Sequence, residues 1–288
     1  MLTKLKSIMR KLIKAQLVLL AIVFIGFSCS VTEQEEPGNI EEVPLDVQAK
    51  IQDMGFDVNG IIKYEDGYLV EGDIYLNDDI IAETLENASL PNQEQYRTSN
   101  LVSVSGSSRT IRVWLEPAMR TAAGGRYLTA LTTARNRYNN VSGLRLRFAI
   151  TTNRSSANIR IVGFSQGPDS QGRIVLGSAG FPRFGNPHNE IRMNRFYYDT
   201  RGTVNDLATT IAHEIGHCIG FRHTDYFNRA ISCGGPFDNE GSGGVGAIHI
   251  PGTPTGADLA GNGSYMLACA GGNRPFTTND VRALQFLY

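Results

Sequence analysis

The distribution of hydrophobic positions predicts a compact α+β unit in the second part of the chain. Strict alternation of hydrophobic and polar residues is typical of half-buried strands, whereas recurrence at three and four residues indicates a helix. The first helix of this unit is expected over residues 127–138. The expected strands are residues 110–115, 144–150, 158–164, 173–176 and 190–196, with a glycine-rich stretch between the last two.

A second, longer helix is expected over residues 204–219. Thr203 precedes it as an N-cap, and Asp206 three residues later completes a variant of the capping box. Gly220 follows at the position where a helix commonly ends in the left-handed conformation. After a loop-dominated segment, a short helix that begins around residues 278–280 closes the chain.

The pattern upstream of this unit predicts a smaller segment with a different character. A short helix near its start is followed by residues 64–75, which alternate like a hairpin with Asp66 and Gly67 as its turn. Residues 87–108 are then rich in Ser, Asn and Gln and poor in hydrophobic residues. This polar stretch is the natural boundary between the two parts of the chain.

Length and charge limit the organisation and the partners. A chain of 288 residues can bury one ordinary core of roughly 150–200 residues and still carry additional segments. We therefore expect one domain over residues 109–288, preceded by a small segment over residues 47–108. The formal net charge of −1 supplies no basic field that could hold a phosphate backbone, so nucleic acid is excluded as a partner. The sequence gives no indication of an oligomeric state.

The N-terminus has the pattern of a signal peptide. Basic residues up to Lys14 precede an apolar run over residues 15–27, interrupted by Gln16 alone. A membrane-spanning helix needs about 20 apolar residues, and this run is shorter. Residues 1–28 are therefore predicted to direct export.

A cysteine directly after this run predicts a lipid anchor. The residues Gly-Phe-Ser-Cys at 26–29 resemble the lipobox of bacterial lipoproteins, in which signal cleavage leaves a lipidated cysteine. Cys29 is then the membrane attachment, and residues 29–46 form a lipidated N-terminus and tether. This predicts a bacterial membrane lipoprotein that faces the periplasm or the cell surface. The alternative is a plain secretory signal, a free Cys29 and a secreted protein.

Three cysteines remain beyond the candidate lipidation site. An exported chain favours disulfide pairing. Cys218 lies within the predicted helix over residues 204–219, and we expect it to be a buried thiol. Cys233 and Cys269 are the favoured disulfide, although sequence alone leaves the connectivity open.

Residues 213–223 contain the chemistry of a zinc site. They read His-Glu-Ile-Gly-His-Cys-Ile-Gly-Phe-Arg-His, so that His213 and His217 lie one helical turn apart on one face. Gly220 permits a sharp turn, after which His223 can reach the same ion as a third ligand. Glu214 lies beside the first ligand, where it can hold a zinc-activated water and take its proton as general base. One catalytic Zn²⁺ with an open fourth position is therefore predicted.

Other interpretations of these residues predict no catalysis. Three surface histidines on an amphipathic helix would bind nothing. A closed structural zinc site with Cys233 or Cys269 as fourth ligand would leave Glu214 without a function. In that case the chain would be a non-catalytic, surface-binding lipoprotein. Asp238 and Glu240 could bind Ca²⁺, but their spacing matches no firm rule.

The motif resembles that of the metzincin zinc peptidases residue for residue, and the HEIGH sequence resembles the bacterial dual-action HEIGH metallopeptidases. The resemblance covers residues 109–288. It implies a metzincin-like α+β catalytic domain with a twisted, mixed five-stranded sheet, an active-site helix and a C-terminal helix. Ser264-Tyr265-Met266 is similar to the family's Met-turn, which places Met266 beneath the zinc. Astacins and serralysins have a tyrosine two residues later, where this chain has Ala268.

The resemblance also suggests how a peptide and an inhibitory segment are bound. The segment at 173–180 resembles the strand that pairs with substrate, although a simple glycine-rich loop would read similarly. Residues 70–74 resemble the aspartate switch of astacin propeptides, in which Asp73 would occupy the open zinc position. The end of an ordinary hairpin is the alternative. Activation would then require cleavage in the linker, with Arg97 or Arg109 as candidate sites.

Together these features predict an exported lipoprotein zymogen. Its domain over residues 109–288 would be a zinc-dependent endopeptidase that acts on protein or peptide substrates.

Overall fold

The computed structural model describes residues 42–288 except 87–95, 171, 242–245 and 270. Residues Glu41–Tyr288 form one compact unit. The predicted signal peptide, Cys29 and the tether up to residue 41 lie outside the described residues. Within the described part of the chain, no helix combines the length and hydropathy needed to cross a membrane.

A mixed eight-stranded sheet organises this unit, with the order β1-β2-β3-β8-β9-β7-β5-β6. Five of its strands come from the predicted domain: β5 (Arg109–Leu115), β6 (Leu146–Thr151), β7 (Ile159–Phe164), β8 (Gly177–Ala179) and β9 (Glu190–Asn194). The upstream segment adds β1 (Ile62–Tyr64), β2 (Gly67–Val70) and β3 (Ile74–Asn77). The predicted α+β class and mixed sheet are confirmed, and the sheet continues into the upstream segment.

Most pairs in the sheet are parallel. Strand β5 pairs in parallel with β6 and β7, and β7 pairs in parallel with β9. Strand β8 runs antiparallel to β9, and β3 joins the free edge of β8 in parallel. A separate two-stranded sheet joins β4 (Tyr96–Arg97) to β10 (Ile248–His249).

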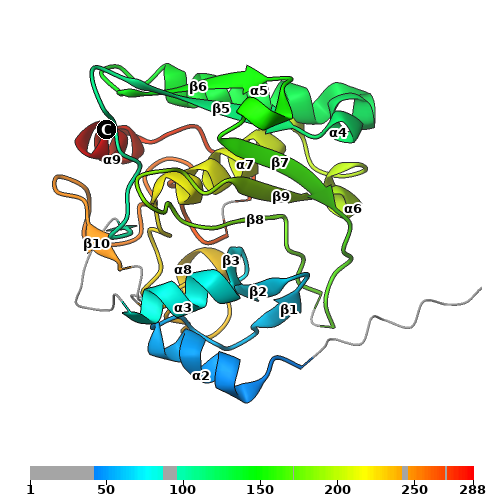
Figure 1. Cartoon of the computed structure of the whole chain (residues 1–288), viewed down its shortest axis with the longest axis vertical. Coiled ribbons are helices and arrows are strands. Elements are labelled where there is room, and N and C mark those ends of the chain that lie inside the picture. Colours follow the sequence, from blue (N-terminus) through cyan, green and yellow to red (C-terminus); the bar gives the residue numbers. More distant parts are fainter. Residues whose placement is uncertain (1–41, 87–95, 171, 242–245, 270) are drawn as a thin grey trace, which may run out of the picture. The chain divides into compact units, whose positions relative to one another are not determined.

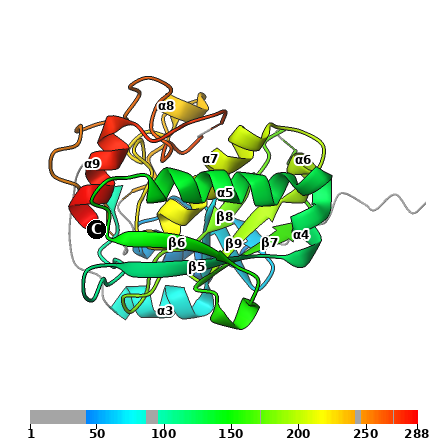
Figure 2. The ribbon, with the colours of Figure 1, turned by 90° about the horizontal axis from the view of Figure 1, so that it is seen from above.

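Two long helices pack side by side against the sheet (Figures 1 and 2). They are α5 (Arg126–Asn139) and α7 (Val204–Ile219), and both agree with the predicted helices within one residue. Their buried residues share one hydrophobic core with the strands of the domain and with the last helix. The remaining helices are α2 (Leu45–Asp53), α3 (Asp78–Glu86), α4 (Pro117–Thr121), α6 (Arg195–Tyr198), α8 (Ala230–Cys233) and α9 (Thr278–Leu287), with short 3-10 helices at Ala122–Gly125 and Arg154–Ser156.

The strand predicted over residues 173–176 is wrong in position, because the chain pairs only from Gly177 onward. Small residues explain the shift. A Cβ atom at Gly177 would lie 2.8 Å from Glu214 Oε1, and one at Gly180 would lie 2.7 Å from the His188 ring. The glycines that suggested a loop instead allow β8 to lie directly against α7.

The upstream hairpin forms as predicted, but its turn lies one residue earlier. Tyr64 pairs with Gly67, so the turn residues are Glu65 and Asp66. Gly67 belongs to β2, where a Cβ atom would overlap with the Leu76 carbonyl oxygen.

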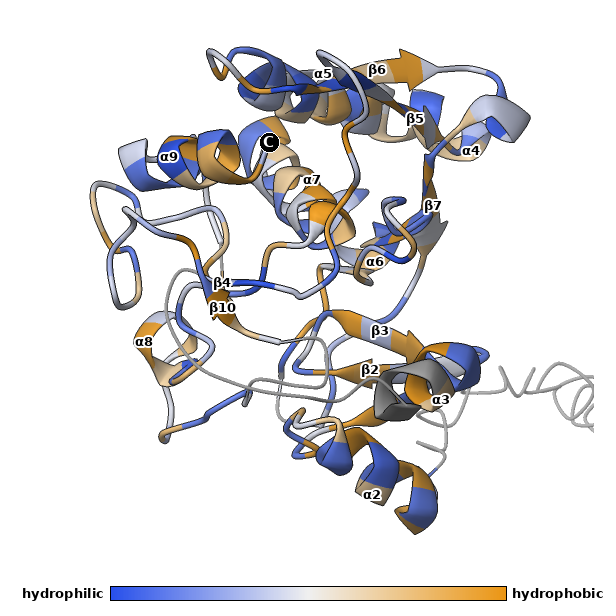
Figure 3. Cartoon of the chain, turned by 60° about the vertical axis from the view of Figure 1, so that its left-hand side comes forward, coloured by the Kyte–Doolittle hydropathy of each residue, from blue (hydrophilic) through white to orange (hydrophobic). Residues whose placement is uncertain are grey.

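The upstream segment has a small hydrophobic core of its own. Strands β2 and β3 are mainly hydrophobic and buried on both faces (Figure 3). Helix α2 contributes Ile51, which is fully buried in this cluster. Phe181, two residues after the end of β8, is part of the same cluster. The segment is therefore packed against the edge of the domain.

The polar stretch before residue 109 is also integrated into the fold. Tyr96, Thr98 and Val102 are buried, and the Thr98 amide donates to the Gly220 carbonyl oxygen over 2.8 Å. Arg97 lies in β4 and Arg109 lies in β5. Because a protease needs an unpaired, extended backbone, cleavage at Arg97 or Arg109 would require these strands to open locally, and the activation site stays a prediction.

Candidate metal centre

Helix α7 carries the first two histidines of the motif. It begins with the predicted capping box, in which Thr203 accepts from the Asp206 amide and Asp206 accepts from the Thr203 amide. It ends at Gly220, whose φ of 108° lies in the left-handed region that a side chain rarely adopts. The chain turns there, and His223 comes back to the side of the helix on which His213 and His217 lie.

Each of the three imidazoles has its Nδ1 atom fixed by an acceptor. His213 Nδ1 lies 2.8 Å from the Tyr265 carbonyl oxygen, and His217 Nδ1 lies 2.9 Å from that of Phe221. His223 Nδ1 lies 2.7 Å from Glu240 Oε1. Carbonyl and carboxylate oxygens only accept, so each Nδ1 must carry the proton. In the neutral rings, all three Nε2 lone pairs therefore point to one place.

Asp73 of the upstream segment completes the group. The three Nε2 atoms lie 2.9, 3.2 and 3.2 Å from one another, and Asp73 Oδ2 lies 3.1, 3.7 and 3.0 Å from those of His213, His217 and His223. Ligands about 2.0 Å from a tetrahedral zinc ion would lie about 3.3 Å apart. The four atoms therefore fit one zinc ion with three imidazoles and one carboxylate. Among the residues that the structure describes, this is the one group of this kind.

The charges of the group favour a cation at its centre. Burial lowers the pKa of His217 to about 4, which keeps its lone pair available for a metal at neutral pH. Burial also opposes the charge of His223, but the attraction of Asp73 and Glu240 outweighs it and raises the pKa of His223. The same histidines lower the pKa of Asp73 against the effect of burial. A metal ion would supply the positive charge that these carboxylates select.

Glu214 lies beside this group and is 2% exposed. Burial raises the pKa of its carboxyl well above the usual range, and the Asp73 carboxylate adds to the rise. Its Oε2 atom has no hydrogen-bond partner among the described residues. Because a buried carboxylate oxygen without a partner is costly, this atom has the properties expected of one that receives a proton from water or substrate.

Met266 packs under α7 at the level of the histidines. A Cβ atom at Gly216 would overlap with its Sδ atom, so the glycine of the motif permits this close approach. The Met266 carbonyl oxygen accepts from the Thr224 amide over 2.8 Å. The preceding residue supplies the acceptor for His213, so the turn holds one ligand directly.

Two further contacts fix the segment after Met266. Asp225 Oδ1 accepts a hydrogen bond from the Ala268 amide over 2.8 Å. Cys233 and Cys269 are joined by a disulfide, and Cys218 is a buried free thiol in α7. The loop after the zinc motif and the segment after Met266 are therefore linked covalently.

Glu240 is the functional residue that sequence reasoning missed. It was considered with Asp238 for calcium, but it is fully buried, holds His223 Nδ1 and lies 3.2 Å from Arg229 Nε. A carboxylate on the distal nitrogen fixes the ring and makes it a stronger ligand. Glu240 lies 17 positions after His223 in a glycine-rich loop, so no local pattern in the sequence indicates this contact.

The family model of the dual-action HEIGH metallopeptidases matches residues 68–288. The chain belongs to this family. The match begins upstream of residue 109 and includes Asp73 and the hairpin that carries it. No curated protein matches the chain.

Two solved structures are similar to this HEIGH metallopeptidase. One is high choriolytic enzyme 1, a hatching enzyme zinc-protease from the medaka fish Oryzias latipes, with 14% identity, 70% of this chain and 98% of that chain covered, and a TM-score of 0.36. The other is myroilysin, with 14% identity, 63% and 93% coverage, and a TM-score of 0.36. At these values neither likeness adds to the argument, and membership of the family rests on the family match.

The HEIGH metallopeptidase is a zinc hydrolase, and His213, His217 and His223 would hold its one zinc ion. Bound in such a site, zinc supplies a Lewis acid that polarises a peptide carbonyl and makes water more acidic.

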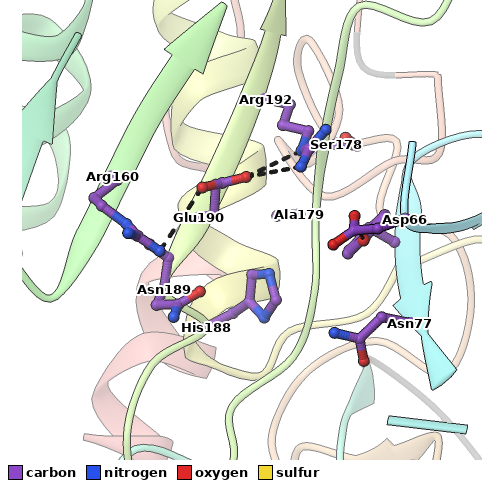
Figure 4. A pocket seen from close by; sticks show the side chains of 10 residues that line it. Asp66, Asn77, Arg160, Ser178, Ala179, His188, Asn189, Glu190 and Arg192 are labelled. Atoms are coloured by element: carbon purple, nitrogen blue, oxygen red, sulfur yellow. Dashed lines mark hydrogen bonds and ion pairs between the residues drawn. The ribbon is translucent and has the colours of Figure 1, made fainter. Parts of the chain in front are cut away.

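A polar cavity of about 180 Å³ lies apart from the metal ligands, between β3, β8 and β9 (Figure 4). Glu190 forms ion pairs with Arg160 and Arg192 at its wall. Burial lowers the pKa of His188, which also lines the cavity, to about 4. His188 is therefore neutral at neutral pH, and it is not among the four residues of the metal group.

Proposed function

We infer that this HEIGH metallopeptidase is made as an inactive precursor of an endopeptidase, and that Asp73 keeps it inactive. The observation that carries the inference is the position of Asp73 Oδ2, which lies 3.0–3.7 Å from the three histidine Nε2 atoms. Catalysis needs a ligand position that water or substrate can enter. A carboxylate in that position excludes both, so the upstream segment acts as a pro-segment.

The backbone around Asp73 supports the same inference. The Asp73 carbonyl oxygen accepts from the Ala179 amide over 3.1 Å, and β3 continues along the edge of β8. An exposed strand edge near a metal is a natural place for an extended peptide to bind by backbone hydrogen bonds. The pro-segment therefore fills the ligand position and pairs with the edge of β8 only at Ile74 and Ala179. A binding site along a strand edge suits an extended segment within a protein chain.

Glu214 would act as general base and then as general acid. Its unpartnered Oε2 atom can accept a proton from an attacking water. The raised pKa of Glu214 suits it to hold this proton and to pass it to the leaving amine. His213, His217 and His223 keep their protons on Nδ1, and they do not take part in the transfer.

The rival function is a surface-binding protein that uses zinc for structure alone. Casein cleavage by the full chain after limited trypsin treatment separates the two, with the cut located by mass spectrometry. We expect cleavage that stops with a chelator and that is absent in Glu214→Ala, whose zinc content should remain that of the wild type. Equal activity in all samples, or a zinc-loaded and processed wild type without activity, would reject the peptidase.

The inferred precursor is an exported lipoprotein. The support is the basic and apolar N-terminus followed by Cys29, as described above. Mass spectrometry of the protein purified from bacterial membranes tests this point. We expect an N-terminal Cys29 that carries acyl chains. A mature protein with an unmodified Cys29 in the soluble fraction would show secretion without an anchor.

A further inference from the structure

Arg222 is a buried cation directly before the third zinc ligand. It is 1% exposed, and its Nη2 atom lies 2.9 Å from Glu71 Oε2 of the pro-segment. Its guanidinium lies over two aromatic rings, 5.3 Å from the centre of Phe56 and 5.8 Å from that of Tyr226. Two of these partners, Glu71 and Phe56, belong to the pro-segment. Removal of the pro-segment would therefore uncover one side of Arg222.

Arg229 lies at the tip of a second hairpin, the turn of residues 71–73 that connects β2 to β3. A Cβ atom at Gly72 would lie 3.0 Å from Arg229 Nη2, so the guanidinium is in contact with the backbone between Glu71 and Asp73. Arg229 attracts both carboxylates electrostatically. The tip thus places Asp73 at the metal group. It places Glu71, two residues earlier in the chain, at Arg222 and Arg229.

The backbone of Glu71 is strained to make this contact. Its φ of 53° lies in the left-handed region, which a residue with a long side chain rarely adopts. Glycine, asparagine or aspartate would adopt this conformation at lower cost. Glu71 is nevertheless 3% exposed, and its carboxylate reaches Arg222. The contact with the arginine accounts for a glutamate at this position.

The described residues of the domain itself offer few carboxylates that offset the positive charges of Arg222 and Arg229. Glu240 Oε2 lies 3.7 Å from Arg222 Nη2, and Glu240 Oε1 lies 3.2 Å from Arg229 Nε. The same Oε1 atom also accepts from His223 Nδ1. Glu240 therefore serves both arginines and a zinc ligand, and Asp238 also attracts Arg229. When the pro-segment is removed, the negative charge of Glu71 is lost, and the net charge of the groups beside the metal becomes more positive.

We propose that Arg222 and Arg229 form a substrate subsite that binds an aspartate or glutamate side chain within two residues of the scissile bond. Glu71 is its internal ligand in the precursor. The proposal rests on the inferred peptidase function and adds its preferred substrate class. The buried guanidinium of Arg222 can form paired hydrogen bonds with a carboxylate, and a neutral amide of the same shape would form weaker hydrogen bonds without the attraction between opposite charges.

The test compares peptides that differ only in whether one side chain ends in a carboxylate or in an amide. The full chain is processed by limited trypsin treatment and given fluorogenic peptides that carry either glutamate or glutamine at each position within two residues of the cleaved bond. At one of these positions we expect kcat/KM to be about tenfold or more higher for glutamate, as for hydrogen bonds to charged groups. In Arg222→Gln and in Arg229→Gln this ratio should fall towards one. Arg147→Gln, an exposed arginine on β6, is the matched control and should keep the wild-type ratio.

Each outcome bears on a different claim. If the wild type cleaves casein and both peptides with the same kcat/KM at every position, the acidic subsite is rejected and the peptidase function stands. If the processed wild type cleaves nothing, both are rejected. Zinc content and circular dichroism identify a variant that fails to fold, and the wild-type ratio and Arg229→Gln then decide the question.

Discussion

Gly177 and Glu214 approach each other so closely that a Cβ atom on Gly177 would lie 2.8 Å from Glu214 Oε1. Strand β8 thus forms the wall against which the candidate general base rests. A methyl group at this position would have to push the carboxylate away from its place beside the histidines.

Gly177→Ala is therefore expected to lower kcat of the processed enzyme by about ten- to a hundredfold, because general base catalysis depends on the position of the carboxylate. Zinc content should stay at the wild-type level, since none of the three histidines contacts Gly177 in this way. Gly256→Ala, at a glycine with open space around it, is the control. Unchanged kcat in Gly177→Ala would show that Glu214 is not held by β8.

Gly216 and Met266 provide a second test of close packing. A side chain at Gly216 would overlap with Met266 Sδ. We expect Gly216→Ala to destabilise the protein by about 1–3 kcal/mol, as for overpacked cores. Thermal unfolding of Gly216→Ala, Met266→Ala and the double variant measures this effect. The cost of Gly216→Ala should be smaller in the Met266→Ala background, and equal costs in both backgrounds would exclude this contact as the cause.

The ion pair between Glu71 and Arg222 predicts a large effect on the precursor. Loss of one partner of a buried pair leaves an uncompensated charge and costs about 3–5 kcal/mol. We expect Glu71→Ala to lower the melting temperature of the precursor and to speed its activation by trypsin. Asp46→Ala, which removes an exposed pair with Lys50, should change stability by less than about 1 kcal/mol. Similar effects of the two variants would contradict the role of the buried pair.

Asp280, which accepts a hydrogen bond from Ser264 in the turn before Met266, predicts a pH dependence of stability. Burial raises its pKa from 3.8 to about 6, despite the hydrogen bond that Ser264 Oγ donates to it over 2.5 Å. The folded state therefore binds this proton more tightly than the unfolded state. The stabilising contribution is complete below pH 3.8 and is lost as the pH rises through about 6.

Asn at position 280 cannot titrate but can still accept hydrogen bonds. We expect the stability of the wild type relative to Asp280→Asn to decrease by about 2–3 kcal/mol between pH 4 and pH 7.5. Thermal unfolding of both proteins across this range measures the difference, and groups shared by the two proteins cancel. A difference that is constant with pH, or that grows in favour of the wild type at higher pH, would contradict the assignment.

The sequence predicts the parts of the site that depend on local periodicity. Helix α7 has the bounds that its capping box and Gly220 indicate, because both caps are formed by residues that are neighbours in the chain. The convergence of His213, His217 and His223 follows from helical spacing and one glycine turn. These features need no information about the rest of the fold.

Features that depend on distant packing were not predictable in the same way. Strand β8 begins four residues later than expected, because Gly177 and Gly180 are required by contacts with Glu214 and His188 rather than by a loop. Glu240 and Arg222 acquire their roles through contacts with His223 and with Glu71, which lies 151 positions from Arg222. Neither residue carries a local pattern that distinguishes it from an ordinary charged residue.

The most direct test of the account is the activity of the unprocessed full chain with and without Asp73. A fluorogenic peptide is given to the wild type, to Asp73→Ala and to Asp73→Ala/Glu214→Ala, each loaded with one zinc. The account predicts that Asp73→Ala is at least about tenfold more active than the wild type, because the carboxylate no longer fills the ligand position, and that the double variant is inactive. An Asp73→Ala precursor that binds zinc and is as inactive as the wild type would contradict it.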